Sequence, residues 1–147
     1  MNWIIKTFSE LTTDELYKIL QLRNEVFIVE QECPYQDIDG KDNESYHIFL
    51  EKDNEVIAYS RILKKGISYE QASIGRVIVK KDYRGGNIAK DMLLKSISFI
   101  ENSLHEKEIK IQAQAYLDKF YSSLRFKKIS DVYLEDNIPH MDMLYKK

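Results

Sequence analysis

The stretch that decides the fold is Val77-Ile-Val-Lys-Lys-Asp-Tyr-Arg-Gly-Gly-Asn-Ile-Ala-Lys-Asp-Met-Leu-Leu94. It begins as an apolar run typical of a β-strand and ends with the apolar spacing of an amphipathic helix. A basic turn with two glycines joins the two. A helix start leaves backbone N–H groups unpaired at the positive end of its dipole, and glycines let a ligand approach them closely. The turn therefore predicts a phosphate site, where Arg84 would add a charged fork suited to a pyrophosphate.

This turn matches neither the Walker loop nor the three-glycine dinucleotide pattern. Read as Arg84-Gly85-Gly86-Asn87-Ile88-Ala89, it resembles the coenzyme A motif of the GNAT N-acetyltransferases, Arg/Gln-x-x-Gly-x-Gly/Ala. The resemblance implies acetyl-CoA as co-substrate: the turn would take its pyrophosphate, the preceding strand would pair with its pantetheine arm, and a helix would begin near Ile88. The implied binding residues are Val77, Ile78, Val79, Arg84, Gly85, Gly86, Asn87, Ile88, Ala89 and Lys90. An ordinary strand-to-helix loop with a solvated arginine is the competing interpretation.

Other segments extend the resemblance over nearly the whole chain. Ala113 to Phe126 resembles the second family element, a strand followed by a short helix bearing Phe-Tyr and closing on Gly-Phe. The segments that resemble the ElaA branch of this superfamily are Leu22 to Gln31, Cys33 to Gly40, Ile74 to Val79 and Ile138 to His140.

The chain departs from the family pattern at two positions. Asn87 stands where the second glycine is usual, and asparagine tolerates the left-handed backbone expected there. Arg125 replaces the glycine that usually ends the short helix, so that helix is expected to end differently.

Composition limits the classes of function. The chain has 147 residues, 44% of them hydrophobic, which predicts a single domain over residues 1–147. A formal net charge of −2 argues against a large nucleic-acid-binding surface. With one cysteine, Cys33, and no zinc-ligand spacing, we expect no metal and a reducing compartment. The sequence lacks a signal peptide or a long apolar run, so we expect a soluble cytoplasmic protein without a membrane partner.

The pattern of elements predicts an α+β fold. It begins with a strand near Trp3 to Phe8 and a helix after the capping box Thr12 to Glu15. The further strands expected are 47–51, 55–63, 72–79, 106–115, 127–134 and 140–145, with a loop at 135–139. These strands predict a mixed, mostly antiparallel twisted sheet with flanking helices. The GNAT resemblance implies a V-shaped cofactor cleft, opened by a bulge that the sequence does not locate.

Acetyl transfer to an amine needs donors for the developing oxyanion and a proton for the thiolate. The N–H groups around Ile78 and Val79 are the implied oxyanion donors. Tyr121 is the candidate proton donor, because the family commonly places a tyrosine of the Phe-Tyr element close to the sulfur. A half-buried core tyrosine is the alternative for Tyr121.

The base that accepts the amine proton is less clear. Side chains that could serve are Glu30, Asp37, Asp39, Glu44 and His140. We favour Glu30, which follows the first helix where the substrate half of the fold is built; a surface carboxylate is its alternative. His140 and His47 are more typical of hydrogen-bonded strand histidines.

The loop from Glu32 to Asn43 is acidic and suggests attraction for a cationic acceptor, although charged loops are usually only solvated. Arg23, on the apolar side of the first helix, is either a stem packed over the core or an anchor for this loop.

Three functions compete. The first is an acetyl-CoA-dependent N-acetyltransferase acting on a primary amine of a small molecule or peptide, by direct attack in a ternary complex. The second is an enzyme similar to acyl-homoserine lactone synthases, which are usually longer. The third is a non-catalytic domain that binds acyl-CoA or a protein. Exposed C-terminal edge strands could also pair two chains into a homodimer.

Overall fold

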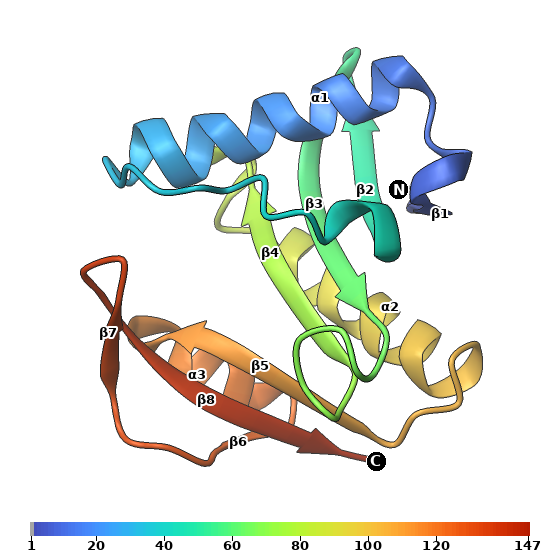
Figure 1. Cartoon of the computed structure of the whole chain (residues 1–147). Coiled ribbons are helices and arrows are strands. Elements are labelled where there is room, and N and C mark those ends of the chain that lie inside the picture. Colours follow the sequence, from blue (N-terminus) through green and yellow to red (C-terminus); the bar gives the residue numbers. More distant parts are fainter. Residues whose placement is uncertain (1) are drawn as a thin grey trace.

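Figure 1 shows the computed structural model of the chain, which describes residues 2–147. Its helices and longer strands follow the predicted order. The elements are β1 (Ile4–Thr7), α1 (Thr13–Arg23), β2 (Tyr46–Lys52), β3 (Glu55–Leu63), β4 (Ser73–Val79), α2 (Ile88–Asn102), β5 (Glu108–Gln114), α3 (Asp118–Ser123), β6 (Phe126–Lys128), β7 (Tyr133–Glu135) and β8 (Ile138–Lys146).

The strands form two antiparallel sheets that meet at one point. The first has the order β1-β2-β3-β4, and the second has the order β5-β8-β6, with β7 also paired to β8. A single parallel bridge from Ala72 to Ile109 joins them, and the amide of Lys110 donates to the carbonyl of Ala72 at 2.9 Å. Beyond this bridge β4 and β5 diverge (Figure 1). The predicted α+β class with a V-shaped opening is confirmed.

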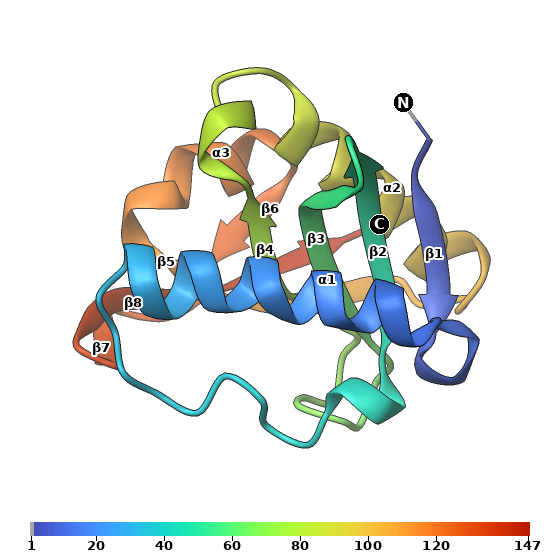
Figure 2. The same cartoon turned by 90° about the horizontal axis from the view of Figure 1, so that it is seen from above.

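The first sheet is covered on both faces, because side chains along a strand alternate in direction. Ile78 packs in a cluster with Ile19 and Val26 from the α1 side, whereas Val79 packs with Met92 and Leu93 of α2. Figure 2 shows α1 crossing over β2, β3 and β4 on the near side, with α2 behind them. Neighbouring residues of β4 therefore hold two different layers together.

The first helix begins as predicted and continues beyond its α-helical part. The Thr12 side chain accepts a hydrogen bond from the Glu15 amide at 3.0 Å, and the Glu15 carboxylate accepts one from the Thr12 amide at 2.8 Å. After Arg23 the chain continues as a π-helical segment, Asn24–Glu30. Such segments are rare and are frequent at functional sites.

The predicted strand at 127–134 is wrong. The chain forms β6 and β7 there, and between them Ser130 leaves the strand so that its hydroxyl accepts a hydrogen bond from the Asp142 amide. The predicted loop at 135–139 is also too long. Asp136 and Asn137 both have positive φ, 50° and 63°, and close a two-residue hairpin between β7 and β8. Asp53 and Asn54, with φ of 51° and 63°, close the hairpin predicted between β2 and β3.

Within residues 2–147, no helix has both the length and the apolar character needed to span a membrane.

Candidate active site

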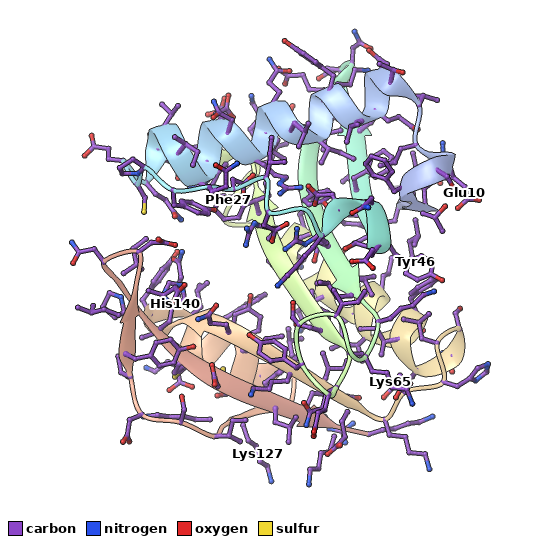
Figure 3. All side chains as sticks on the ribbon, viewed as in Figure 1. Glu10, Phe27, Tyr46, Lys65, Lys127 and His140 are labelled. Carbon is purple, nitrogen blue, oxygen red and sulfur yellow. The ribbon has the colours of Figure 1, made fainter. Side chains whose placement is uncertain are left out.

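A cleft of about 820 Å³ lies where β4 and β5 separate. In Figure 3, Phe27 comes from the side of α1 and His140 from β8, and the two face each other across the opening. Of the predicted site residues, those lining the cleft are Glu30, Val77, Ile78, Val79, Arg84, Gly85, Gly86, Ala89 and Tyr121. Asn87, Ile88 and Lys90 are outside its lining.

The bulge that opens the cleft lies at Arg76. The register of β3 against β4 shifts between Tyr59, which pairs with Ile78, and Arg61, which pairs with Gly75. Arg76 has a φ of 51°, a left-handed conformation that is uncommon for arginine. The extra residue bends β4 away from β5.

The strand register decides which amides face the cleft. The Lys80 amide donates to the Ile57 carbonyl at 2.7 Å, and Ala58 lies opposite Val79. Hydrogen-bonding direction alternates along an antiparallel strand, so the Val79 amide points away from β3 and toward the opening. The same alternation directs the Ile78 amide at β3. The register thus turns the Val79 amide, and not the Ile78 amide, toward the cleft, and the role of an oxyanion donor stays a prediction.

The turn from Arg84 to Lys90, here called the phosphate turn, pairs the amide of Arg84 with the Lys81 carbonyl at 3.3 Å but not the amides that follow it. Within residues 2–147, the N–H groups of residues 85–90 have no hydrogen-bond acceptor, and the first paired amide of the helix is that of Asp91, which donates to Asn87 at 2.9 Å. The Asn87 side chain does not cap the helix either. These donors point from the start of α2 and suit an anion.

The two glycines of the phosphate turn have different roles. Gly85 has a φ of 90°, which glycine adopts without a steric cost. Gly86 is not left-handed, and a Cβ there would meet no protein atom within 4 Å. Asn87 has a φ of −102°, so our expectation of a left-handed asparagine is wrong. The turn takes its left-handed residue at Gly85, and Gly86 borders open space.

Arg84 is held at both ends of its guanidinium. Its Nε donates to the Val79 carbonyl at 2.8 Å, and its Nη1 and Nη2 donate to the Glu30 carboxylate at 2.6 and 3.0 Å. The hydrogen bonds from Arg84 hold the pKa of Glu30 below its ordinary value, which makes this carboxylate a weaker base. The salt bridge links the end of the π-helical segment to the phosphate turn.

Tyr121 is buried, yet its hydroxyl reaches the cleft. Only 5% of the residue is exposed, and its ring packs edge-on against Phe126. Within residues 2–147 the hydroxyl has no hydrogen-bond partner, and Arg61 Nε is the one fully buried side-chain polar atom that lacks a partner. The Tyr121 hydroxyl must therefore keep contact with the open space. Burial raises the pKa of Tyr121, so the phenol stays protonated.

The candidate bases differ in position. Asp37 and Asp39 are held by arginines, and Glu44 is exposed outside the cleft lining. His140 lines the cleft, and its Nδ1 donates to the Ile138 carbonyl at 2.7 Å, which leaves Nε2 as an acceptor in the neutral ring. His47 is buried and structural, as expected: Nε2 donates to the Asp42 carbonyl at 2.9 Å and Nδ1 accepts from Tyr59 at 2.6 Å.

The acidic loop, residues 32–43, has most of its carboxylates bound by arginines. Arg23 Nε donates to Asp37 at 2.9 Å and Arg23 Nη1 to Asp42 at 2.7 Å, which confirms Arg23 as the anchor of this loop. The resulting arginine–aspartate cluster consists of Arg23, Arg61, Arg76, Asp37, Asp39 and Asp42. Its formal charges cancel. The loop therefore lacks the excess negative charge that suggested a cationic acceptor.

Arg125 adopts the backbone that glycine would adopt. Its φ is 74°, and its amide donates to the Ser122 carbonyl at 3.0 Å at the end of α3. The expectation that this helix ends differently is wrong. The guanidinium lies 5.4 Å from the centre of the Tyr145 ring, a contact that offsets part of the backbone strain.

Sequence reasoning did not single out Arg76, which lines the cleft and forms the bulge. The available signal was Gly75, because a glycine inside a strand often marks a bulge. Residues 2–147 contain no group of three or more His, Cys, Asp or Glu side chains arranged to hold a metal ion.

Comparison with known proteins gives consistent matches over nearly all of the chain. A family model described as acetyltransferase (GNAT) domain matches residues 9–147. Protein ElaA of Escherichia coli is 42% identical over 145 residues, which cover 97% of this chain and 95% of ElaA. The crystal structure of ElaA superimposes with a TM-score of 0.92, covering 99% of this chain and 100% of ElaA.

Two further structures extend this comparison. An acyl-CoA N-acyltransferase from Pseudomonas aeruginosa is 36% identical, with a TM-score of 0.92 and coverage of 99% of both chains. The acyl-homoserine lactone synthase LasI has a TM-score of 0.78 at 13% identity, covering 99% of this chain and 90% of LasI. At that identity the likeness to LasI shows a common fold alone.

Proposed function

Since this chain belongs to the GNAT family of acetyltransferases, in its ElaA-like branch, and is an acyltransferase, we propose that it transfers the acetyl group of acetyl-CoA to a primary amine. The acceptor is an amine of a small molecule or a peptide. It attacks directly while both substrates are bound in the cleft. A cytoplasmic location fits the free thiol of Cys33, which suits a reducing compartment.

The observation that carries this proposal is the run of N–H groups at residues 85–90 that have no acceptor in the part of the chain described, residues 2–147. An unpaired backbone donor is costly unless water or a ligand satisfies it. The open space beside Gly86 leaves room for an anionic group to approach these donors. The phosphate turn thus fits the diphosphate of coenzyme A, with the donors aligned at the positive end of the α2 dipole.

The walls of the cleft supply the groups that the reaction needs. Acetyl-CoA would bring the thioester whose carbonyl carbon accepts the amine nitrogen. The Val79 N–H, which points away from β3, is the proposed donor to the carbonyl oxygen as negative charge develops there. The Tyr121 hydroxyl, protonated and in contact with the cleft, is the proposed donor of the proton to the departing sulfur.

The amine proton has two candidate acceptors on the cleft wall. Glu30 lies near the phosphate turn, but its salt bridge with Arg84 counts against it as a base. His140 has its Nε2 free to accept, directly or through water. We therefore propose His140 as the base, with Glu30 as the alternative.

Binding and turnover should be tested separately. We expect calorimetry to show saturable binding of coenzyme A and acetyl-CoA, and a thiol-release assay with an amine panel to show turnover. Absence of any binding to a demonstrably folded protein would overturn the proposal. Binding without release for any amine would favour the non-catalytic alternative.

The proton donor is tested by Tyr121→Phe, which removes the hydroxyl and keeps the packed ring. We expect kcat to fall by roughly 100-fold or more, because general acid catalysis contributes about 10² to 10⁴. The dissociation constant of acetyl-CoA should stay unchanged. Because the raised pKa keeps Tyr121 protonated, the wild-type rate should not lose this acid up to the ordinary phenol value of about 10. If Tyr121→Phe kept the wild-type rate at every pH, Tyr121 would be excluded as the proton donor.

A further inference from the structure

Arg76 combines a strained backbone with a side chain that two of its three guanidinium nitrogens hold in place. A left-handed φ of 51° is less favourable for arginine than for glycine. Strained residues of this kind persist where the surrounding contacts hold them in place, and they concentrate at functional sites. Arg76 also forms the bulge, directly before the strand segment that carries Val79.

The guanidinium of Arg76 is fixed in orientation. Its Nε donates to Asp37 Oδ1 at 2.7 Å, and its Nη2 donates to the Asp37 carbonyl at 3.1 Å and contacts Asp39 Oδ2 at 3.5 Å. It also lies over two aromatic rings, 6.0 Å from the centre of Phe27 and 5.7 Å from the centre of Tyr35. A guanidinium held in this way loses little further freedom when it binds a ligand.

One nitrogen of Arg76 is left over. Within residues 2–147, Nη1 has no hydrogen-bond partner, and it is not among the buried atoms that lack one, so it remains accessible. Arg76 lines the cleft. Nη1 is therefore a positioned, charged donor without an acceptor, on the wall where the amine substrate would enter.

Each aspartate beside Arg76 also has another arginine partner. Asp37 also accepts from Arg23 at 2.9 Å, and both oxygens of Asp39 accept from Arg61 at 2.8 Å. The third aspartate, Asp42, is bound by Arg23 and Arg61 at 2.7 and 2.9 Å. The loop can thus be anchored by two arginines. The third arginine offers its remaining nitrogen to a ligand.

On the basis of the proposed function, we propose that Arg76 Nη1 binds a carboxylate of the acceptor. The acceptor class is then an amine that carries a carboxylate, that is, an amino acid or an amino acid derivative, rather than a polyamine. A charge-assisted hydrogen bond from a pre-organised guanidinium discriminates against neutral and cationic analogues.

The direct test compares amines that differ only in the carboxylate. Acetylation rates should be measured for α-amino acids against their amides, and for 4-aminobutyrate against butylamine and 1,4-diaminobutane. In the set that the enzyme prefers, we expect kcat/KM to be roughly 10- to 100-fold higher for the amine that carries a carboxylate than for its analogues. A hydrogen bond to a charged group accounts for a factor of this size. A wild-type enzyme that prefers the diamine, or is indifferent to the carboxylate, overturns the inference.

Variants of Arg76 test the contact itself. Arg76→Gly removes the guanidinium while relieving the left-handed backbone, so the bulge should persist. We expect this variant to lose the preference for the carboxylate, so that an amino acid and its amide are acetylated at similar rates, while acetyl-CoA still binds. Arg76→Lys should restore part of the preference, because it keeps the charge but not the fork.

A matched control is Lys41→Gln, which removes one positive charge from the same cleft wall; Lys41 Nζ donates to Ser68 at 2.9 Å. The carboxylate preference should survive in this variant. If Lys41→Gln lost as much of the carboxylate preference as Arg76→Gly, the preference would come from the net positive charge of the cleft wall and not from the Arg76 contact. That result would overturn the inference. The two possible failures give different results. If the proposed function is wrong, no amine releases thiol; if only the Arg76 inference is wrong, thiol release continues and does not depend on the carboxylate.

Discussion

The phosphate turn and the acidic loop treat their polar groups in opposite ways. The turn, residues 84–90, leaves the N–H groups of residues 85–90 without an acceptor among residues 2–147. In the loop, residues 32–43, arginines from other parts of the chain bind the carboxylates at distances of 2.7 to 2.9 Å. The bound residues are Asp37, Asp39 and Asp42. In sequence the loop is the more conspicuous of the two, because it is rich in charge.

This difference separates polar groups that hold the structure together from polar groups that are free to bind a ligand. Carboxylates that are satisfied by buried arginines hold a segment in place and have little capacity left for a ligand. Backbone donors without an acceptor are costly until something satisfies them, so they mark a place where a ligand gains free energy. By this criterion we propose the phosphate turn as the binding element and the acidic loop as a scaffold. Within residues 2–147, Arg76 Nη1 is the accessible guanidinium nitrogen of the arginine–aspartate cluster that lacks a partner.

The largest expected effect is on the scaffold. Arg23→Met would leave Asp37 and Asp42 with one arginine fewer at a site where Arg23 is fully buried. We expect the free energy of unfolding to fall by about 3 to 5 kcal/mol, the usual cost of breaking a buried ion pair. Urea denaturation measures it. Lys95→Met, which removes an exposed charge from α2, should stay within about 0.5 kcal/mol. A similar small loss for Arg23→Met would show that the loop is solvated.

The binding element should be sensitive to negative charge. Gly86→Asp is compatible with the backbone, because Gly86 is not left-handed and its Cβ would enter open space. Its carboxylate would compete with a diphosphate for the unpaired amides. We expect the dissociation constant of acetyl-CoA to rise by roughly 10- to 100-fold, the worth of losing hydrogen bonds to a charged group. Gly86→Asn, of equal size, should cost less. Equal effects would indicate steric exclusion in place of charge.

Stability should depend on pH through the scaffold, in two stages. Burial lowers the pKa of His47, so the unfolded state binds the proton more readily and stability declines as pH falls below about 6.5. Burial alone would raise the pKa of Asp39, but hydrogen bonds from Arg61 outweigh it and hold this pKa well below its usual range. Its contribution is present above about pH 4 and is lost as pH falls further.

Each stage is worth at most about 1.4 kcal/mol per pH unit for one group. Unfolding measured from pH 8 to pH 3 resolves both. His47→Gln should abolish the first stage and keep the second. A first stage that persists in this variant would assign it to another group.

The smallest expected effect concerns the salt bridge between the phosphate turn and the π-helical segment that precedes the acidic loop. Glu30→Gln frees Arg84 from a partly exposed ion pair, whose net worth is about 0.2 to 1 kcal/mol. If the diphosphate competes for Arg84, acetyl-CoA should bind up to about fivefold more tightly. Glu25→Gln, which loses a contact to Lys80 at 3.3 Å, is the control. Weaker binding in Glu30→Gln would show instead that Glu30 positions Arg84 for the ligand.

Local signals in the sequence predicted most of the elements. The capping box at Thr12 to Glu15 and the strand, turn and helix from Val77 onward fix backbone conformation within a few residues, so they can be recognised without the rest of the chain. The short strands β6 and β7 were not resolved in advance, because the break at Ser130 depends on a hydrogen bond from Asp142, in another strand.

The sequence by itself determined the family resemblance, the order of most elements and the position of the phosphate turn, since each rests on spacing between near neighbours. Tertiary structure decided the rest. It placed the bulge at Arg76, turned the Val79 amide toward the cleft, and neutralised the acidic loop with arginines 14 to 39 positions away. The physical reason is that strand register and burial set where a charge or a donor is satisfied, and both depend on contacts between residues far apart in the chain.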